Sequence, residues 1–208
     1  MKLFRSLYSC ALLLFLGGSL SAQNNWVIKK EKEGIVISTR PSDHSAFNDI
    51  QVEMDLPGNI YQMAAILMDV EKYEQWAYAT KKSKLIKRIS LNKLIYYSEF
   101  SAPWPVSNRD LFAVMEVNID SVLNLLQVNT TGQKNYLPSN KDLVRIPYSR
   151  ASWKVSTVSG KVIHLVYFIE IDPGGSVPGW IMNLYSTKGP FYSFKNLKSK
   201  MTLLNPKI

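Results

Sequence analysis

Alternation of apolar and polar residues runs through much of this 208-residue chain and limits its fold more than any other feature. It covers residues 47–56, 94–101 and 109–119, as is typical of strands with one face in a core. Apolar residues recur at helical spacing only over residues 59–76 and 177–201. The order is a hairpin, a helix, a long antiparallel meander and a closing helix, which predicts a single α+β domain.

Turn signals place the remaining elements. Glu33-Gly34 lies between two strands and predicts a hairpin. Gly189-Pro190 predicts a kink or break in the closing helix, for which Ser176 is a suitable N-cap. The other strands are expected at residues 26–31, 35–39, 84–90, 122–130, 144–146, 151–158 and 161–171.

The first 22 residues have the pattern of a secretory signal peptide. Lys2 and Arg5 precede an apolar run at residues 7–16, and the small residue Ala22 marks the cleavage site. A lipoprotein signal ending at Cys10 is less favoured, because it leaves too short an apolar stretch. We therefore expect a signal peptide at residues 1–22 and one domain at residues 23–208. The protein is expected to be exported, to a bacterial periplasm in preference to the medium.

Charge and cysteine content limit the partners. The net charge is +9, and the single cysteine, Cys10, is lost with the leader. An exported basic protein is not expected to meet nucleic acid, whereas an anionic lipid surface is a natural partner. A basic surface that is simply solvated is the alternative. Without thiols or disulfides, the stability of the domain must come from its core.

No pattern for catalysis or metal binding occurs in the sequence. His44 and His164 are far apart and lack ligand spacing, and residues 172–175 are turn chemistry rather than a phosphate loop. We accordingly expect no catalytic residues, no metal and no cofactor.

Three segments resemble one protein family. They are residues 69–76, a helix end with its Trp; residues 103–112, Pro-Trp-Pro-Val-Ser-Asn-Arg-Asp-Leu-Phe; and residues 172–180, the entry into the last helix. Together they resemble the START domain, the lipid-transfer domain related to the steroidogenic acute regulatory protein. The second segment is the most specific of the three.

The resemblance implies a helix-grip fold, in which a curved antiparallel sheet wraps a long C-terminal helix and encloses a hydrophobic cavity. It also implies that the loop at residues 102–108 and the C-terminal helix form a gate. The ligand-binding residues expected from it and from strand alternation are Tyr96, Phe100, Arg109, Leu111, Ala113, Met115, Val117, Ile181, Leu184 and Tyr185. Those expected at the gate and at a membrane are Trp104, Pro105, Trp180, Lys188 and Lys195.

One departure from the family pattern affects the ligand. Many members carry a buried Arg six residues after the Arg of Asn-Arg-Asp, with an acidic partner on the next strand. Here these positions are Met115 and, by counting back, Tyr96, so neither is charged. We expect a ligand with a small neutral polar group or none, rather than a zwitterionic headgroup.

These features predict non-catalytic binding and transfer of one lipid or other hydrophobic molecule by a monomer. The alternative is a cyclase- or hydratase-type enzyme on the same scaffold, which would need inward titratable groups such as Arg109 and His164. A third option is a collapsed cavity with a surface that serves another partner. Trp104 is expected either to enter a membrane interface or to pack against the closing helix.

Overall fold

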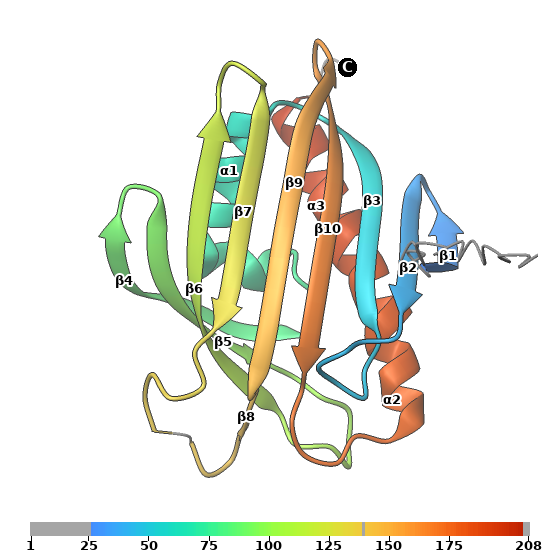
Figure 1. Cartoon of the computed structure of the whole chain (residues 1–208), viewed down its shortest axis with the longest axis vertical. Coiled ribbons are helices and arrows are strands. Elements are labelled where there is room, and N and C mark those ends of the chain that lie inside the picture. Colours follow the sequence, from blue (N-terminus) through green and yellow to red (C-terminus); the bar gives the residue numbers. More distant parts are fainter. Residues whose placement is uncertain (1–25, 139, 206–208) are drawn as a thin grey trace, which may run out of the picture.

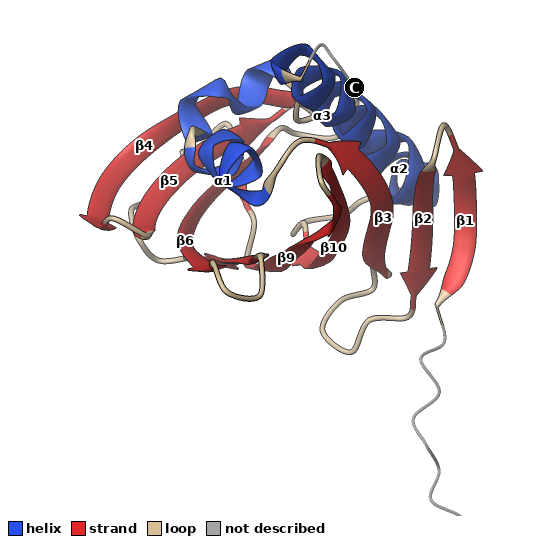
Figure 2. Cartoon of the chain, turned by 90° about the horizontal axis from the view of Figure 1, so that it is seen from above, coloured by secondary structure: helices blue, strands red, loops and turns tan. Residues whose placement is uncertain are grey.

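A curved antiparallel sheet with helices along its concave side forms the whole structure, a computed structural model that describes residues 26–138 and 140–205 (Figures 1 and 2). The strands are β1 (Val27–Lys32), β2 (Ile35–Arg40), β3 (Asp49–Pro57), β4 (Thr80–Ser90), β5 (Lys93–Phe100), β6 (Arg109–Asp120), β7 (Leu125–Gly132), β8 (Val144–Arg145), β9 (Tyr148–Ser159) and β10 (Val162–Asp172). Along the sheet the order is β1-β2-β3-β10-β9-β7-β6-β5-β4, and β8 pairs in parallel with β6. The predicted α+β class and curved antiparallel sheet are confirmed.

The first helical segment is shorter and more irregular than the sequence predicts. Helix α1 (Ile60–Met68) begins with a capping box between Asn59 and Gln62. It ends at Asp69, and the rest of the predicted helix is a 3₁₀ segment, η1 (Val70–Gln75). Both segments lie against the concave side of the sheet (Figure 2).

The closing helix is continuous and consists of three consecutive segments. They are α2 (Gly179–Asn183), the π-helical η2 (Leu184–Lys188) and α3 (Gly189–Leu204). Pro190 lies in the first turn of α3, where it has no N–H for a carbonyl in the preceding turn, and the helix is irregular just before it. The helix begins after Pro178 rather than at the predicted N-cap Ser176, because residues 174 and 175 still have the positive φ angles of a turn.

Each long strand buries one face, and the buried faces meet in one core. On β6 the odd-numbered residues from Leu111 to Val117 point to the concave side, as their alternation predicts. They pack with the concave faces of β3, β9 and β10 and with Phe194 and Leu197 of α3. This burial of apolar surface holds the helix against the sheet.

The two outermost strands, β1 and β4, leave the sheet with free edges (Figure 1). Both are rich in lysine: Lys29, Lys30 and Lys32 lie on β1, and Lys81, Lys82, Lys84 and Lys87 lie on β4. Several strand boundaries differ from those predicted by a few residues, most at β4 and β7. Strand β7 begins at Leu125 rather than at residue 122, because the side chain of Asp120 accepts the backbone N–H groups of Val122 and Leu123 and holds a turn. The predicted leader and its cleavage site lie outside the described residues.

Candidate functional site

The concave face is packed tightly at one end and less tightly at the other. On β10, Ile163 and Leu165 are fully buried, whereas Tyr167, Ile169 and Ile171 further along the same face keep accessible surface. Phe100, at the end of β5, also lies at the margin of the core and is partly accessible. Accessible apolar surface on a concave face is therefore concentrated toward the C-terminal end of β10.

Small side chains line the middle of the sheet at the same level. Ile171 is paired with Ser149, and Ile169 with Ala151. Gly132 on β7 is paired with Ala113 on β6. These short side chains make the surface of the sheet low between β10 and β6, although at Gly132 the Leu111 side chain and the Ser149 backbone already lie close by.

The predicted ligand residues on β5 and β6 lie on this concave face. Leu111, Ala113, Met115 and Val117 are all buried there. Tyr96 lies opposite Ala113, and Met115 lies opposite Leu94. Counting back along the family pattern places the partner position near Tyr96, and the register makes Leu94 the direct neighbour of Met115, with Tyr96 on the diagonal.

Tyr96 belongs to a buried group of aromatic side chains. Its ring is 5.7 Å from that of Tyr73 and nearly perpendicular to it. Burial raises the pKa of Tyr96 well above its usual value, and a hydrogen bond with the Thr130 hydroxyl lowers it in part. The hydroxyls of Tyr96 and Thr130 are both neutral at physiological pH. The interior around Tyr96 therefore carries polar groups but no charge.

Arg109 ties two loops together at the less tightly packed end. Its guanidinium donates hydrogen bonds to the carbonyl oxygens of Ser107 and, at 3.3 Å, Gly174. The side chain is buried, and burial lowers its pKa, while the nearby Tyr185 phenol acts in the opposite direction. Arg109 thus connects the proline loop at residues 102–108 to the turn that leads into α2.

A surface cavity of about 500 Å³ lies between these two loops. Its lining includes the expected site residues Pro105 and Arg109, and it also includes Val144 and Val177. The proline loop and the segment that enters α2 thus lie on either side of this surface cavity, and we call its opening the mouth.

We expect the substitution Arg109→Met to loosen this mouth. It removes two hydrogen bonds from a charged donor, each worth about 1.5–3 kcal/mol, so the free energy of unfolding should fall by roughly 1–3 kcal/mol after repacking. Hydrogen exchange measured by mass spectrometry should be faster at residues 102–108 and 172–178. Arg150→Met, which changes an exposed arginine on β9, is the control. Unchanged exchange in both loops would show that Arg109 does not hold them.

Asp110, the next residue, serves a different loop on the convex side. Its carboxylate accepts two hydrogen bonds from the Arg145 guanidinium, at 2.7 and 2.9 Å. Arg145 also donates to the carbonyl oxygens of Lys134 and Leu137 and lies over the Phe112 ring. Arg109 and Asp110 thus point to opposite faces of the sheet, as successive residues of a strand do.

The closing helix contributes unequally to the site. Ile181 is fully buried, and Leu184 and Tyr185 are partly buried. The Tyr185 hydroxyl donates to the Ser101 carbonyl at 2.9 Å and so joins the helix to the proline loop. Trp180 is 53% exposed at the start of α2.

The residues expected at a membrane fall into two groups. Trp104 is 89% exposed, so it is not packed against the closing helix. Lys188 is also exposed, at the end of η2. Lys195 lies further along α3, where it forms an ion pair of 3.0 Å with Glu33 of the first hairpin.

His164 points away from the interior. Its neighbours Ile163 and Leu165 are buried on the concave face, and its ring nitrogens lie 2.8 Å from Asp55 and 3.3 Å from Glu53. His164 therefore does not supply the inward titratable group that the enzyme alternative would need. Among the buried charged side chains of the described residues, only Arg109 lies on the concave face.

Comparison with known proteins now decides the family. A family model described as START domain matches residues 6–205. The chain belongs to the START domain family. The crystal structure of a STAR-related lipid transfer protein from Xanthomonas axonopodis matches it with a TM-score of 0.76 and 28% sequence identity, over 85% of this chain and 98% of that chain.

Two curated proteins are also similar to this START domain. An uncharacterised protein of Pseudomonas aeruginosa is 26% identical over 178 residues, which cover 84% of this chain and 86% of the relative. Mouse phosphatidylcholine transfer protein is 21% identical over 169 residues, which cover 79% of this chain and 78% of the relative. The predicted resemblance and the helix-grip fold are confirmed.

Three residues of this START domain site were missed from the sequence: Tyr167, Ile169 and Ile171. Alternation along residues 161–171 puts them on one face, but it does not tell which strands lie beside β10. The sheet order does, because it places β10 between β3 and β9 and opposite the closing helix (Figure 2).

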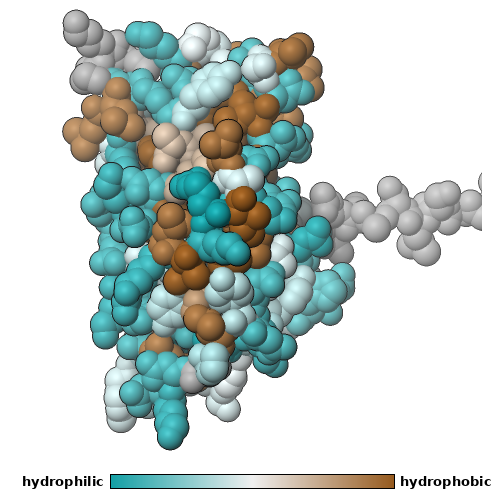
Figure 3. Space-filling model, turned by 90° about the vertical axis from the view of Figure 1, so that its left-hand side faces the viewer, coloured by the Kyte–Doolittle hydropathy of each residue, from teal (hydrophilic) through white to brown (hydrophobic). Residues whose placement is uncertain are grey.

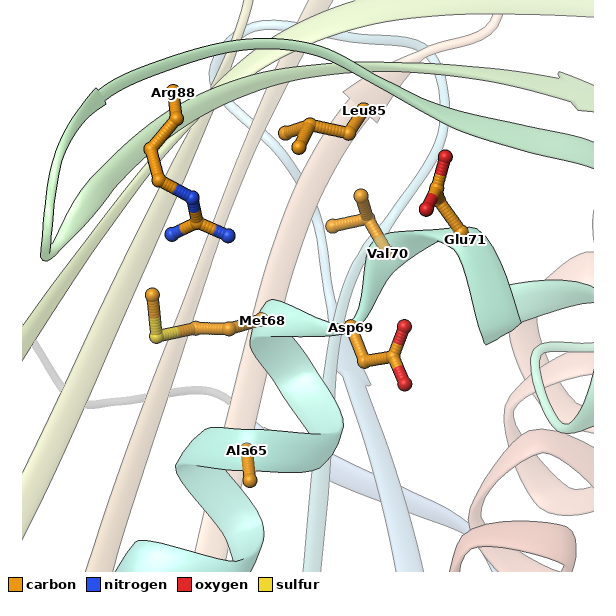
Figure 4. A pocket seen from close by; sticks show the side chains of 7 residues that line it. All are labelled: Ala65, Met68, Asp69, Val70, Glu71, Leu85 and Arg88. Atoms are coloured by element: carbon orange, nitrogen blue, oxygen red, sulfur yellow. The ribbon is translucent and has the colours of Figure 1, made fainter.

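A second cavity of about 300 Å³ lies away from these residues, between α1, η1 and β4. Figure 4 shows Leu85 and Arg88 reaching it from β4, and Ala65 and Met68 from α1. On this side of the molecule, apolar and hydrophilic side chains are mixed in one patch (Figure 3). No expected site residue lines this cavity.

In the part of the chain that the structure describes, no helix is long and apolar enough to cross a membrane. Within the same residues, no group of three or more His, Cys, Asp or Glu side chains could hold a metal ion.

Proposed function

We propose that this START domain binds one lipid or other hydrophobic molecule between its sheet and its closing helix, and transfers it without chemical change. The observation that carries the proposal is the accessible apolar surface of Tyr167, Ile169 and Ile171 on a concave face whose centre is buried. The resemblance to proteins named for lipid transfer supports the same function.

The energetics of lipid movement explain what such a site supplies. Exposing an acyl chain of about 14 methylenes to water costs on the order of 11 kcal/mol. A lipid chain that moves from a membrane into an interior lined by Leu111, Met115 and Ile181 passes from one apolar environment to another. Most of the cost of exposure to water is therefore avoided. The remaining barrier is the opening of the mouth.

The proposed gate consists of the proline loop and the segment from Gly174 to η2. Few bonds hold the two together: those of Arg109 to Ser107 and Gly174, and that of Tyr185 to Ser101. The π-helical turn just before Pro190 is a natural place for the helix to bend. Opening there leaves the packed part of α3, from Phe191 to Met201, on the sheet.

Contact with a membrane at this mouth is part of the proposal. Trp104→Ala should lower binding to vesicles of phosphatidylglycerol by about tenfold, because an exposed indole that enters the interface buries a large apolar area. Sedimentation of the vesicles measures the bound fraction. Leu91→Ala, an exposed apolar residue in the β4–β5 turn, is the control. Binding that survives Trp104→Ala undiminished would exclude insertion of this residue.

The proposal also covers where the protein works and in what form. A leader at residues 1–22 supports export, and a thiol-free mature chain suits a periplasm. We propose a monomer, since a carrier of this kind needs only one cavity and one mouth. The enzyme alternative, a cyclase or hydratase, loses support because His164 faces outward and the concave face carries no other buried charge than Arg109 among the described residues.

Native mass spectrometry of the full-length protein purified from a periplasmic extract tests the function directly. We expect a bound mass of a few hundred daltons, released intact into organic solvent. A protein that carries no lipid, and takes up none from vesicles, would contradict the proposal. A bound molecule that leaves chemically altered would favour the enzyme.

A further inference from the structure

Two hydrogen-bond donors of the aromatic core have no partner among the residues that the structure describes; the buried hydroxyls of Thr39 and Thr80, outside that core, lack one as well. The first is Nε1 of Trp76, a side chain that is only 5% exposed. The second is the hydroxyl of Tyr167, a partly buried side chain for which no hydrogen bond is found within the same residues. Leaving a buried donor unpaired costs about 1–3 kcal/mol, so such groups normally have a partner.

Both donors lie beside one aromatic ring. The Trp153 ring is 6.3 Å from that of Trp76 and 4.4 Å from that of Tyr167. Phe194 of α3 closes the same cluster, 5.3 Å from Tyr167 and 5.4 Å from Trp153. The donors therefore belong to one part of the interior, where the 3₁₀ segment η1, strands β9 and β10 and the closing helix meet.

Neighbouring hydroxyls are engaged elsewhere. Tyr73 donates to the carbonyl of Leu67 at 2.5 Å, and Tyr96 has the Thr130 hydroxyl as its partner. Within this aromatic cluster, Trp76 and Tyr167 are therefore the donors that remain for a guest. An indole N–H can only donate, so the group that satisfies it must be an acceptor.

The surroundings also select against charge. Burial is the largest cause of the raised pKa of Tyr167, which means that a negative charge is poorly solvated at this place. The concave face has no buried carboxylate among the described residues to balance a cation, and Arg109 at the mouth is bonded to two backbone carbonyls. A charged headgroup would lose its hydration here without gaining a counter-charge.

We propose that the interior recognises an uncharged lipid through an acceptor oxygen, of the ester or carbonyl kind, that takes hydrogen bonds from Trp76 Nε1 and the Tyr167 hydroxyl. This inference rests on the proposed lipid-binding function and adds the chemical class of the ligand. The hydrocarbon part of such a ligand lies along Ile169 and Ile171 toward the mouth.

Competitive displacement of Nile red tests the inference with three probes: methyl oleate, 1-octadecene and dioleoyl phosphatidylcholine. The first two share an apolar chain and differ in the ester. Wild-type protein should prefer methyl oleate over both of the others. Tyr167→Phe and Trp76→Phe should each lower the affinity for methyl oleate about 3- to 10-fold, as the loss of one hydrogen bond predicts, and leave that for 1-octadecene unchanged.

Tyr192→Phe, the same change on an exposed tyrosine of α3, is the matched control and should alter neither affinity. Tyr167→Phe keeps the ring and its packing, so it remains informative if Trp76→Phe weakens the fold. Equal losses for methyl oleate and 1-octadecene, or no loss for either, would overturn the inference while the lipid-binding function stands. Tighter binding of phosphatidylcholine than of methyl oleate would overturn it as well. Failure of the wild-type protein to bind any of the three probes would overturn the proposed function together with the inference.

Discussion

The substitution Asp110→Ala is expected to lower the free energy of unfolding by about 3–5 kcal/mol, a large part of the stability of a domain of this size. The side chains of Asp110 and Arg145 are only 2% and 5% exposed. Removing the carboxylate leaves a guanidinium buried without its counter-charge, and it also weakens the support for the loop whose carbonyls Arg145 holds. Urea denaturation, followed by tryptophan fluorescence, measures the change.

The control is an exposed ion pair on the same sheet. Lys93 and Glu116 are paired on β5 and β6 with side chains 39% and 56% exposed. Lys93→Ala should change the free energy of unfolding by less than about 1 kcal/mol. A loss of under 1 kcal/mol for Asp110→Ala would mean that the buried pair contributes no more to stability than the exposed one. That result would contradict the prediction.

The substitution Ile171→Trp is expected to abolish ligand binding while the fold remains intact. Ile171 lies on the concave face beside Ser149 and keeps accessible surface, so a larger ring fits the free space rather than forcing the core apart. The ring then occupies the place of the ligand, and affinity for a fluorescent fatty-acyl probe should fall by at least about 100-fold, as the loss of some 3 kcal/mol of apolar contact predicts. Fluorescence titration measures the affinity.

Val166→Trp is the matched control, because it makes a similar change on the same strand but on the convex face. It should leave the affinity unchanged. Thermal unfolding of both variants checks that they are folded, and filling free space should leave the midpoint of Ile171→Trp equal to or above that of the wild type. Normal binding by Ile171→Trp would place the ligand elsewhere and contradict the proposed site.

The architecture was predictable from the sequence to a large extent, because periodicity reports which residues share a face. The hairpin around Glu33, the alternation of residues 109–119 and the closing helix were all found this way. The predicted ends of strands and helices were wrong where the hydrogen bonds of a local polar group set the boundary. Asp120 delays the start of β7 through its own hydrogen bonds, and the predicted first helix becomes a 3₁₀ segment after Asp69.

The site was less predictable, because it depends on which strands become neighbours. Leu111 and Met115 were found from alternation alone. Tyr167 and Trp76 were not, since their unpaired donors emerge only when Tyr167 of β10 and Trp76, which follows η1, are both brought beside the Trp153 ring. The outward orientation of His164 follows from the burial of its two neighbours, and the sequence alone left the face of that strand undecided.

The lysine-rich outer strands affect how readily two copies of the protein associate through their sheet edges. An open sheet offers unpaired N–H and C=O groups at both margins, and a second molecule can add its own strand there to start a fibril. Like charges along β1 and β4 repel such an addition. In the carrier proposed above, whose layers part to admit a ligand, the same repulsion would keep an open molecule from pairing its edges with those of another copy.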